Sequence, residues 1–285
     1  MSLVTSKELL LKAQENSYAV GAFNVENMEM AQAIIEAAEE LRAPVILQTT
    51  PSTVRYAGVN LYYANVKTLA ERSSVPAVLH LDHGNSFELC VQALRAGYTS
   101  IMIDGSRLPL EENIALTRKV VEMCNPVGIP VEGEIGRVGG KEDDLVCENE
   151  GYTIPEEAVR FEKETGLSSM AVGVGTAHGV YRTTPVLNTE LIGRLKGMLT
   201  VPMVLHGASG LSDEAIRECV RRGICKVNFA TELRIAYSDG VKELLREKPD
   251  TFDPKVYGKA GRQRVKELVK NRMRVCGCDG KASIR

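Results

Sequence analysis

Short apolar segments alternate with longer amphipathic segments along the whole chain, and this alternation restricts the fold more than any other feature. The short segments have the length and composition of buried strands, and apolar residues recur at helical spacing in the longer ones. Strands are predicted at residues 19–24, 45–48, 77–81, 100–104, 131–135, 169–174, 203–205 and 226–229. Helices are predicted at residues 29–41, 87–96, 111–123, 155–165, 190–196 and 213–222, with a helical tail at about 253–273.

Eight strand–helix units in succession predict an α/β fold, a closed (β/α)8 TIM barrel with extra C-terminal helices. The alternative is an open, doubly wound parallel sheet, but no G-x-G-x-x-G motif follows the first predicted strand. A barrel of this kind accommodates 285 residues as one unit. Because no shift in composition marks a boundary, we expect a single domain over residues 1–285.

Composition excludes several classes of partner. The 35 basic and 37 acidic residues nearly cancel, so no general field attracts nucleic acid. No apolar run approaches the roughly 20 residues that span a membrane, and the N-terminal segment lacks the pattern of a signal peptide. The seven cysteines are odd in number and scattered, which indicates reduced thiols and a cytoplasmic protein.

Histidine placement gives the strongest signal of chemistry. The chain has four histidines, and His83, His178 and His206 each end an apolar run and precede a glycine. Three imidazoles on separate strands can surround one zinc ion and leave a position open for substrate. The alternative, without a metal, is a set of three histidines that form hydrogen bonds at the barrel rim. His80 lacks the glycine, and we interpret it as a residue behind the ligands or in the packing.

Other polar residues also follow predicted strands, and active sites of this fold form at the carboxyl ends of the strands. Asp82 lies beside a proposed ligand and is the first candidate for moving a proton, although it could instead orient an imidazole. The remaining members of this strand-end set are Asn24, Ser52, Asp104, Glu134, Ser209, Asn228 and Thr231. Their spread over several strands favours one shared site.

Three segments after predicted strands suggest specific tasks. Residues 133–145 form a glycine-rich stretch with three consecutive acids, Glu142, Asp143 and Asp144, which predicts a mobile loop that could bring one of these acids over a substrate. The segments HGASG and NFATE offer backbone N–H groups, hydroxyls and a helix N-terminus, which suit a phosphate. Lys226 raises a rival mechanism through a Schiff base, but we expect it at the N-terminal end of its strand, far from the catalytic rim.

Taken together, these segments resemble the class II, zinc-dependent ketose-bisphosphate aldolases over nearly the whole chain. The resemblance lies in LHLDHGNSFE (79–88), MIDGS (102–106), VEGEIGRVGGKEDD (131–144), GTAHG (175–179), VLHGASG (204–210) and KVNFATEL (226–233). GTAHG followed by TTP, the GRVGG-x-EDD stretch and VNFATEL are more similar to the tagatose-1,6-bisphosphate branch than to the fructose-1,6-bisphosphate branch.

The resemblance implies roles for individual residues. It places one Zn²⁺ per subunit on His83, His178 and His206, makes Asp82 the catalytic proton donor, and makes Glu142 the acid that exchanges a proton with the ketose carbon. It places Asp104 and Glu134 near the metal, and it gives a basic residue of the neighbouring subunit, matched here by Lys259 or Arg262, to the second phosphate. The expected substrate-binding residues are Asn24, Ser52, Gly179, Gly207, Ala208, Ser209, Asn228, Phe229, Ala230, Thr231, Lys259 and Arg262.

The expected reaction is the reversible, zinc-dependent cleavage of D-tagatose 1,6-bisphosphate to dihydroxyacetone phosphate and D-glyceraldehyde 3-phosphate. The resemblance also implies a homodimer or homotetramer, a possible monovalent cation and a possible separate activating subunit. The alternatives are an aldolase for fructose 1,6-bisphosphate or another phosphorylated ketose, a phosphosugar epimerase or isomerase, and a zinc-holding binding protein without catalysis.

Overall fold

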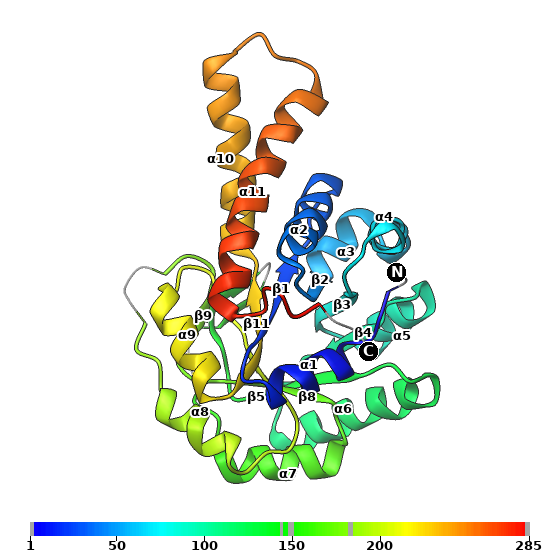
Figure 1. Ribbon diagram of the computed structural model, residues 1–285. Coiled ribbons are helices and arrows are strands. Elements are labelled where there is room, and N and C mark those ends of the chain that lie inside the picture. The colour runs from blue at the N-terminus through cyan, green and yellow to red at the C-terminus, as the bar shows by residue number, and fades with distance from the viewer. Residues whose placement is uncertain (1–2, 143–144, 148–150, 182–184, 283–285) are drawn as a thin grey trace.

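A computed structural model describes residues 3–142, 145–147, 151–181 and 185–282, with the backbone alone for residues 140–142 and 145–147. It confirms the closed barrel: eight parallel strands follow one another around the ring in the order β1-β11-β10-β8-β5-β4-β3-β2 (Figure 1). The strands are β1 (Val20–Asn24), β2 (Val45–Thr49), β3 (Ala77–Gly84), β4 (Ser100–Ile103), β5 (Val131–Ile135), β8 (Ser169–Val172), β10 (Met203–Leu205) and β11 (Ile224–Phe229).

Helices cover the outside of the ring, and side chains fill its inside, so every residue of these eight strands is buried. The helices are α2 (Met28–Leu41), α3 (Pro51–Ala57), α4 (Val59–Arg72), α5 (Phe87–Ala96), α6 (Leu110–Cys124), α7 (Pro155–Thr165), α8 (Thr189–Lys196), α9 (Asp213–Arg222), α10 (Thr231–Glu247) and α11 (Pro254–Cys276), with a short 3-10 turn, η1 (Asn125–Val127). The predicted helices are all present, whereas α3, α4, α10 and an N-terminal helix at Ser6–Glu15 lie in segments where no helix was predicted.

The N-terminal helix α1 (Ser6–Glu15) packs at the end of the barrel where the strands begin. The backbone N–H of Val4 donates to the carbonyl of Ala77, the first residue of β3, over 3.0 Å. The opposite end, where the strands finish, is therefore the end available for a site. No helix in the described part of the chain is long and apolar enough to cross a membrane.

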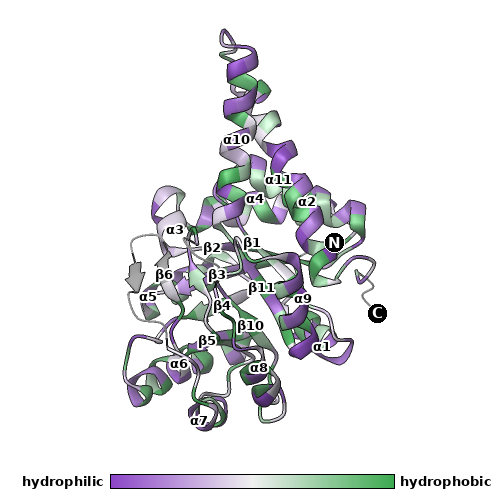
Figure 2. Ribbon diagram, turned by 90° about the vertical axis from the view of Figure 1, so that its left-hand side faces the viewer, coloured by the Kyte–Doolittle hydropathy of each residue, from purple (hydrophilic) through white to green (hydrophobic). Residues whose placement is uncertain are grey.

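The α10–α11 hairpin projects beyond the barrel and forms the tapering upper part of the molecule in Figure 1 and Figure 2. The inner half of α11 packs along α2 through charged pairs, in which Lys266 and Lys270 both contact Glu40. Burial of Val265, Val269 and Met273 gives the same helix an apolar face. These contacts hold the inner half of the predicted helical tail against α2.

A small second sheet lies over the barrel mouth, where the sequence predicted only a mobile loop. It contains β6 (Gly139–Glu142), β7 (Leu145–Cys147) and β9 (Ala177–His178), in the order β7-β6-β9. Gly140 pairs with His178 in the parallel β6–β9 ladder. The loop prediction is therefore wrong for residues 139–142, because the glycine pair is held by strand pairing.

Candidate metal and substrate site

The three histidines that were singled out from the sequence meet at the carboxyl end of the barrel. One nitrogen from each imidazole lies within 4.8 Å of the others. The closest pair is Nε2 of His83 and Nδ1 of His206, 2.7 Å apart. Their ring centroids are 4.5 Å apart, and the His178 ring lies 5.0 Å from that of His83. Residues separated by up to 123 positions in sequence thus share one small volume.

The end of β3 explains how two consecutive residues both reach this volume. Neighbouring side chains of a regular strand point to opposite faces. Here the register between β3 and β4 shifts between Leu81 and Gly84, and His83 adopts a left-handed backbone with φ of 48°. A bulge of this kind re-aims a side chain. Asp82 therefore points into the barrel while His83 turns back over its mouth.

The glycine after His83 serves packing rather than access for a ligand. A Cβ atom on Gly84 would lie 2.4 Å from the carbonyl oxygen of Met102 in β4. Only glycine allows the two backbones to approach this closely.

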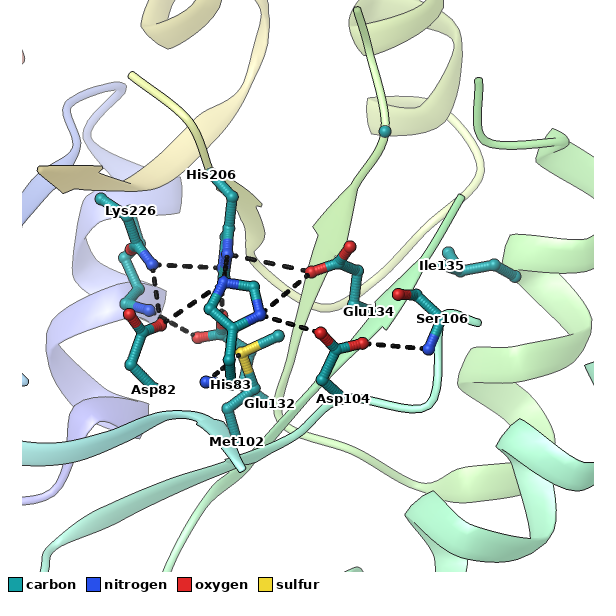
Figure 3. Close-up of polar contacts among 12 residues, drawn as sticks. Asp82, His83, Met102, Asp104, Ser106, Glu132, Glu134, Ile135, His206 and Lys226 are labelled. Atoms are coloured by element: carbon teal, nitrogen blue, oxygen red, sulfur yellow. Dashed lines mark hydrogen bonds and ion pairs between the residues drawn. The ribbon is translucent and has the colours of Figure 1, made fainter. Parts of the chain in front are cut away.

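In two of the imidazoles, the nitrogen that faces away from the cluster contacts a carboxylate. Nδ1 of His83 lies 2.9 Å from Oδ2 of Asp104, and Nε2 of His206 lies 2.9 Å from Oε1 of Glu132. The expected residue Glu134 is close to both rings, with an oxygen 3.9 Å from Nδ1 of His83 and 3.8 Å from Nδ1 of His206 (Figure 3). His83, Asp104 and Glu134 form a second group in which one ligand atom from each residue lies within 4.8 Å of the others.

These partners decide where the imidazole protons lie. When a carboxylate accepts a hydrogen bond from the nitrogen that faces it, that nitrogen carries the proton and the other nitrogen keeps a lone pair. Nε2 of His83 and Nδ1 of His206 then face each other as two acceptors only 2.7 Å apart. Burial lowers the pKa of His206, and His83 lowers it further, so an extra proton is disfavoured. A metal cation fits this donor set chemically.

Both supporting carboxylates are ionised at neutral pH. Burial alone would raise the pKa of Asp104, but its hydrogen bonds with His83 and Ser106 bring that pKa well below its usual value. Burial would also raise the pKa of Glu132, and the opposing effects of Lys226, His206 and His80 bring it well below its usual value.

Asp82 is held by three amide side chains. Its Oδ2 accepts from Gln48 Nε2 over 3.0 Å and from Asn24 Nδ2 over 3.4 Å, and its Oδ1 accepts from Asn228 Nδ2 over 3.1 Å. The nearer oxygen is 4.0 Å from Nε2 of His83. Amide donors favour the charged carboxylate and fix its direction. Asp82 is thus positioned to accept a proton beside the histidine cluster.

A cavity next to the cluster collects most of the residues expected to bind phosphate. Ser209 Oγ accepts from the backbone N–H of Ala230 over 3.1 Å, which joins the loops after β10 and β11. Tyr181 contacts Gly207 and Ala177 through its hydroxyl group and ties these loops to β9. The cavity is lined by Asn24, His178, Gly179, Gly207, Ser209, Asn228, Ala230, Thr231 and Arg234.

Several expected residues are not among those that line this cavity. The Phe229 side chain is buried and stacks on Phe23, with ring centroids 5.4 Å apart, and Ala208 is fully buried. Ser52 lies in α3, where its hydroxyl contacts Thr50. Lys259 and Arg262 both lie on α11, and Arg262 contacts Gln32 and Glu36 of the same chain. Glu142 belongs to β6, but its side chain lies outside the described part of the structure.

His80 is buried behind the cluster, within the range of positions that the sequence indicated for it. Its Nδ1 contacts Ser100 Oγ over 2.8 Å, and its Nε2 lies 3.5 Å from Lys226 Nζ. Burial lowers the pKa of His80 well below its usual value, and Lys226 adds to that effect, so the ring is neutral. It supports the site through Lys226 rather than by touching an imidazole of the cluster.

The position predicted for Lys226, at the N-terminal end of its strand and far from the site, is wrong. Three further residues of the site, Glu132, Gln48 and Arg234, were not predicted from the sequence. β11 begins at Ile224, so Lys226 is the third residue of its strand, and its Nζ lies 2.9 Å from Glu132 beneath the histidines. Glu132 contacts His206, and Gln48 donates to Asp82. Both point inward at strand positions, and the spacing of Glu132 and Glu134 two residues apart was the available signal. Arg234, on the first turns of α10, had no such signal.

Comparisons with known proteins agree over almost the whole chain. Residues 4–281 match the family described as class-II fructose-bisphosphate aldolase. The chain is 44% identical to the D-tagatose-1,6-bisphosphate aldolase subunit GatY of Klebsiella oxytoca over 282 residues, which is 98% of this chain and 99% of that protein.

Solved structures give the same result. The YdjI aldolase from Escherichia coli K12 is 36% identical, with a TM-score of 0.89, over 99% of this chain and 100% of that one. The fructose-bisphosphate aldolase Fba from Campylobacter jejuni is 23% identical, with a TM-score of 0.82, over 98% of this chain and 97% of that one, and this likeness concerns the fold alone. From its fold, its sequence and the extent of these matches, the chain belongs to the class-II fructose-bisphosphate aldolase family.

Proposed function

We propose that this enzyme catalyses the reversible aldol cleavage of D-tagatose 1,6-bisphosphate to dihydroxyacetone phosphate and D-glyceraldehyde 3-phosphate. The observation that carries the proposal is the convergence of the three imidazoles beside Asp82 and the loop cavity. The choice of tagatose is supported by the 44% identity to a relative named for that substrate. The family description instead names fructose bisphosphate. Fructose 1,6-bisphosphate, which differs from the tagatose sugar only at C4, is therefore the second candidate.

His83, His178 and His206 would hold one zinc ion per subunit, in keeping with a family that is generally zinc-dependent. When bound, zinc supplies a Lewis acid that stabilises negative charge developing on the substrate oxygens. Asp104 and Glu132 contact, in two of these imidazoles, the nitrogen that faces away from the shared volume. A role for a monovalent cation remains a prediction from the family resemblance.

The protein residues then account for substrate placement and proton transfer. Backbone and hydroxyl groups of Gly207, Ser209 and Thr231 line the cavity, and the N-terminus of the long helix α10 favours an anion there. With the phosphate fixed, the C4 hydroxyl can lie against Asp82. Asp82 accepts the hydroxyl proton as the C3–C4 bond breaks and the aldehyde forms. We assign the subsequent protonation of the three-carbon product to Glu142.

The second phosphate and the quaternary structure belong to the same proposal. We infer that Lys259 or Arg262 of a neighbouring copy contacts that phosphate in a homodimer or homotetramer. Both residues lie on α11, in the hairpin that projects from the barrel (Figure 1). The relative's name contains the word subunit, which supports a separate partner chain.

The decisive experiment is cleavage kinetics on D-tagatose and D-fructose 1,6-bisphosphates, with triose phosphate release measured by a coupled assay. We expect turnover of both sugars with the higher kcat/KM for tagatose, loss of activity with a chelator, and recovery with added zinc. A higher kcat/KM for fructose would assign the second candidate. Full turnover in metal-stripped enzyme would contradict the zinc mechanism, and sugar isomerisation without triose products would indicate an epimerase or isomerase.

A further inference from the structure

A row of polar side chains runs through the barrel interior beneath the histidine cluster. Lys226, Glu132, His80 and Ser100 are each no more than 2% exposed. Barrels of this fold usually fill that space with branched apolar residues. A buried charge is costly unless it is paired and hydrogen-bonded, and apolar residues would avoid that cost. A row of polar residues in this place therefore indicates a function.

The contacts form a continuous path that ends at a proposed metal ligand. Nζ of Lys226 lies 2.9 Å from Oε2 of Glu132, and the other oxygen of Glu132 lies 2.9 Å from Nε2 of His206 (Figure 3). On its other side, Lys226 reaches His80, which contacts Ser100, whose hydroxyl contacts Ser6 of α1 over 2.9 Å. The path therefore joins the floor of the barrel to its mouth.

Two groups compete for Nε2 of His206, and the competition decides the tautomer. If Nε2 carries the proton, it donates to Glu132 at 2.9 Å. If Nε2 instead accepted from Asn228 Nδ2 at 3.3 Å, the proton would move to Nδ1, which faces His83. Nδ1 would then have no lone pair for a metal. The shorter, charge-assisted contact favours the first arrangement.

We propose that Glu132 and Lys226 are positioning residues that hold His206 in the tautomer with its proton on Nε2, so that Nδ1 is free to bind the metal. Glu132 accepts a hydrogen bond from the Nε2–H group of His206, and Lys226 neutralises the carboxylate and fixes its orientation within the core. His80 accepts a hydrogen bond from Lys226 and so limits where the ammonium group can lie. This inference rests on the proposed function, because Glu132 and Lys226 act here by preparing His206 to bind a metal.

The first test uses the wild-type protein without metal. Long-range ¹H–¹⁵N NMR correlations report which nitrogen of each histidine is protonated, and a His206→Gln variant assigns the signals. We expect the Nε2–H tautomer for His206 near neutral pH. A dominant Nδ1–H tautomer overturns the proposal, whatever the protein's affinity for zinc.

The second test separates the hydrogen-bond acceptor from general packing. Lys226→Met with Glu132→Leu removes both charges and the acceptor, whereas Lys226→Met with Glu132→Gln removes the charges but keeps an acceptor. Both pairs avoid an unpaired buried charge. We expect the Leu pair to weaken zinc binding about 10- to 100-fold in a chelator competition. The Gln pair should recover most of that affinity, and the visible spectrum of its cobalt-substituted form should match wild type.

The outcomes are distinguishable from failure of the proposed function. Wild-type protein that does not bind zinc contradicts the metal site itself, while the tautomer measurement still decides the role of Glu132. Zinc affinity unchanged in the Leu pair overturns the positioning role alone. Equal loss in the Leu and Gln pairs also overturns it, since the acceptor would then make no difference.

Discussion

At the scale of single residues, Asp82 combines near-complete burial with three amide partners. Gln48, Asn24 and Asn228 come from three different strands and all donate to its carboxylate. None of them is charged, so they orient the group without neutralising it. A carboxylate held in this way can accept a proton from a substrate hydroxyl in a defined direction.

Asp82→Asn keeps the shape of the side chain but removes its ability to accept the proton. We expect kcat for cleavage to fall about 10²- to 10⁴-fold, the usual contribution of a general base. Zinc content and the circular dichroism spectrum should match wild type, because Asp82 is not among the three proposed ligands. Cleavage at the wild-type rate in a zinc-loaded Asp82→Asn protein would assign the proton transfer elsewhere.

The sequence located the residues at strand ends and missed those inside the strands. His83, His178, His206 and Asp82 follow apolar runs, so the position of active sites in barrels was enough to group them. Glu132 lies within β5, where side chains usually serve packing, and Lys226 was interpreted only as a rival Schiff-base lysine at the N-terminal end of its strand. The inward turn of His83 also had no sequence signal, because it depends on a bulge between β3 and β4.

At the scale of elements, the strength of the apolar pattern decided which helices could be predicted. Only Tyr62, Val66 and Ala70 of α4 are buried, and α10 buries only Leu233 and Gly240. These stripes are too narrow to give a clear helical period. The hairpin is instead stabilised by close contact between α10 and α11, which the sequence does not reveal as an apolar face.

Gly240 provides a test of that close contact. A Cβ atom there would lie 2.7 Å from the carbonyl oxygen of Ala260 in α11. We expect Gly240→Ala to separate the helices and lower the free energy of unfolding by about 1–3 kcal/mol, as overpacking does. The matched control is Gly193→Ala in α8, where a Cβ would come no closer than 3.6 Å to another residue.

Because alanine favours a helix where space allows, Gly193→Ala should raise stability by about 0.5–1 kcal/mol. Thermal unfolding of both variants beside wild type measures the two effects. The packing account requires shifts of opposite sign. An unchanged or raised midpoint for Gly240→Ala would show that α10 and α11 tolerate separation.

At the scale of the whole molecule, barrel closure and metal binding make separate contributions to the stability of the fold. The proposed ligands lie on β3, on β9 of the small sheet and after β10, so the closed ring and the small sheet together bring them into one volume. The core that closes the ring consists of buried apolar residues on every strand and does not include the ligands. The fold should therefore form before the metal binds, unlike small domains whose folding depends on zinc.

Removal of zinc tests this separation. We expect the metal-free enzyme to keep its circular dichroism spectrum at 25 °C and to unfold at a lower temperature. The difference follows from linkage, since a ligand at 1,000 times its Kd stabilises the native state by about 4 kcal/mol. His178→Ala should abolish the zinc-induced shift while leaving the metal-free midpoint close to wild type, because His178 is only partly buried on the small sheet. Loss of helical signal on metal removal would instead make zinc part of the fold.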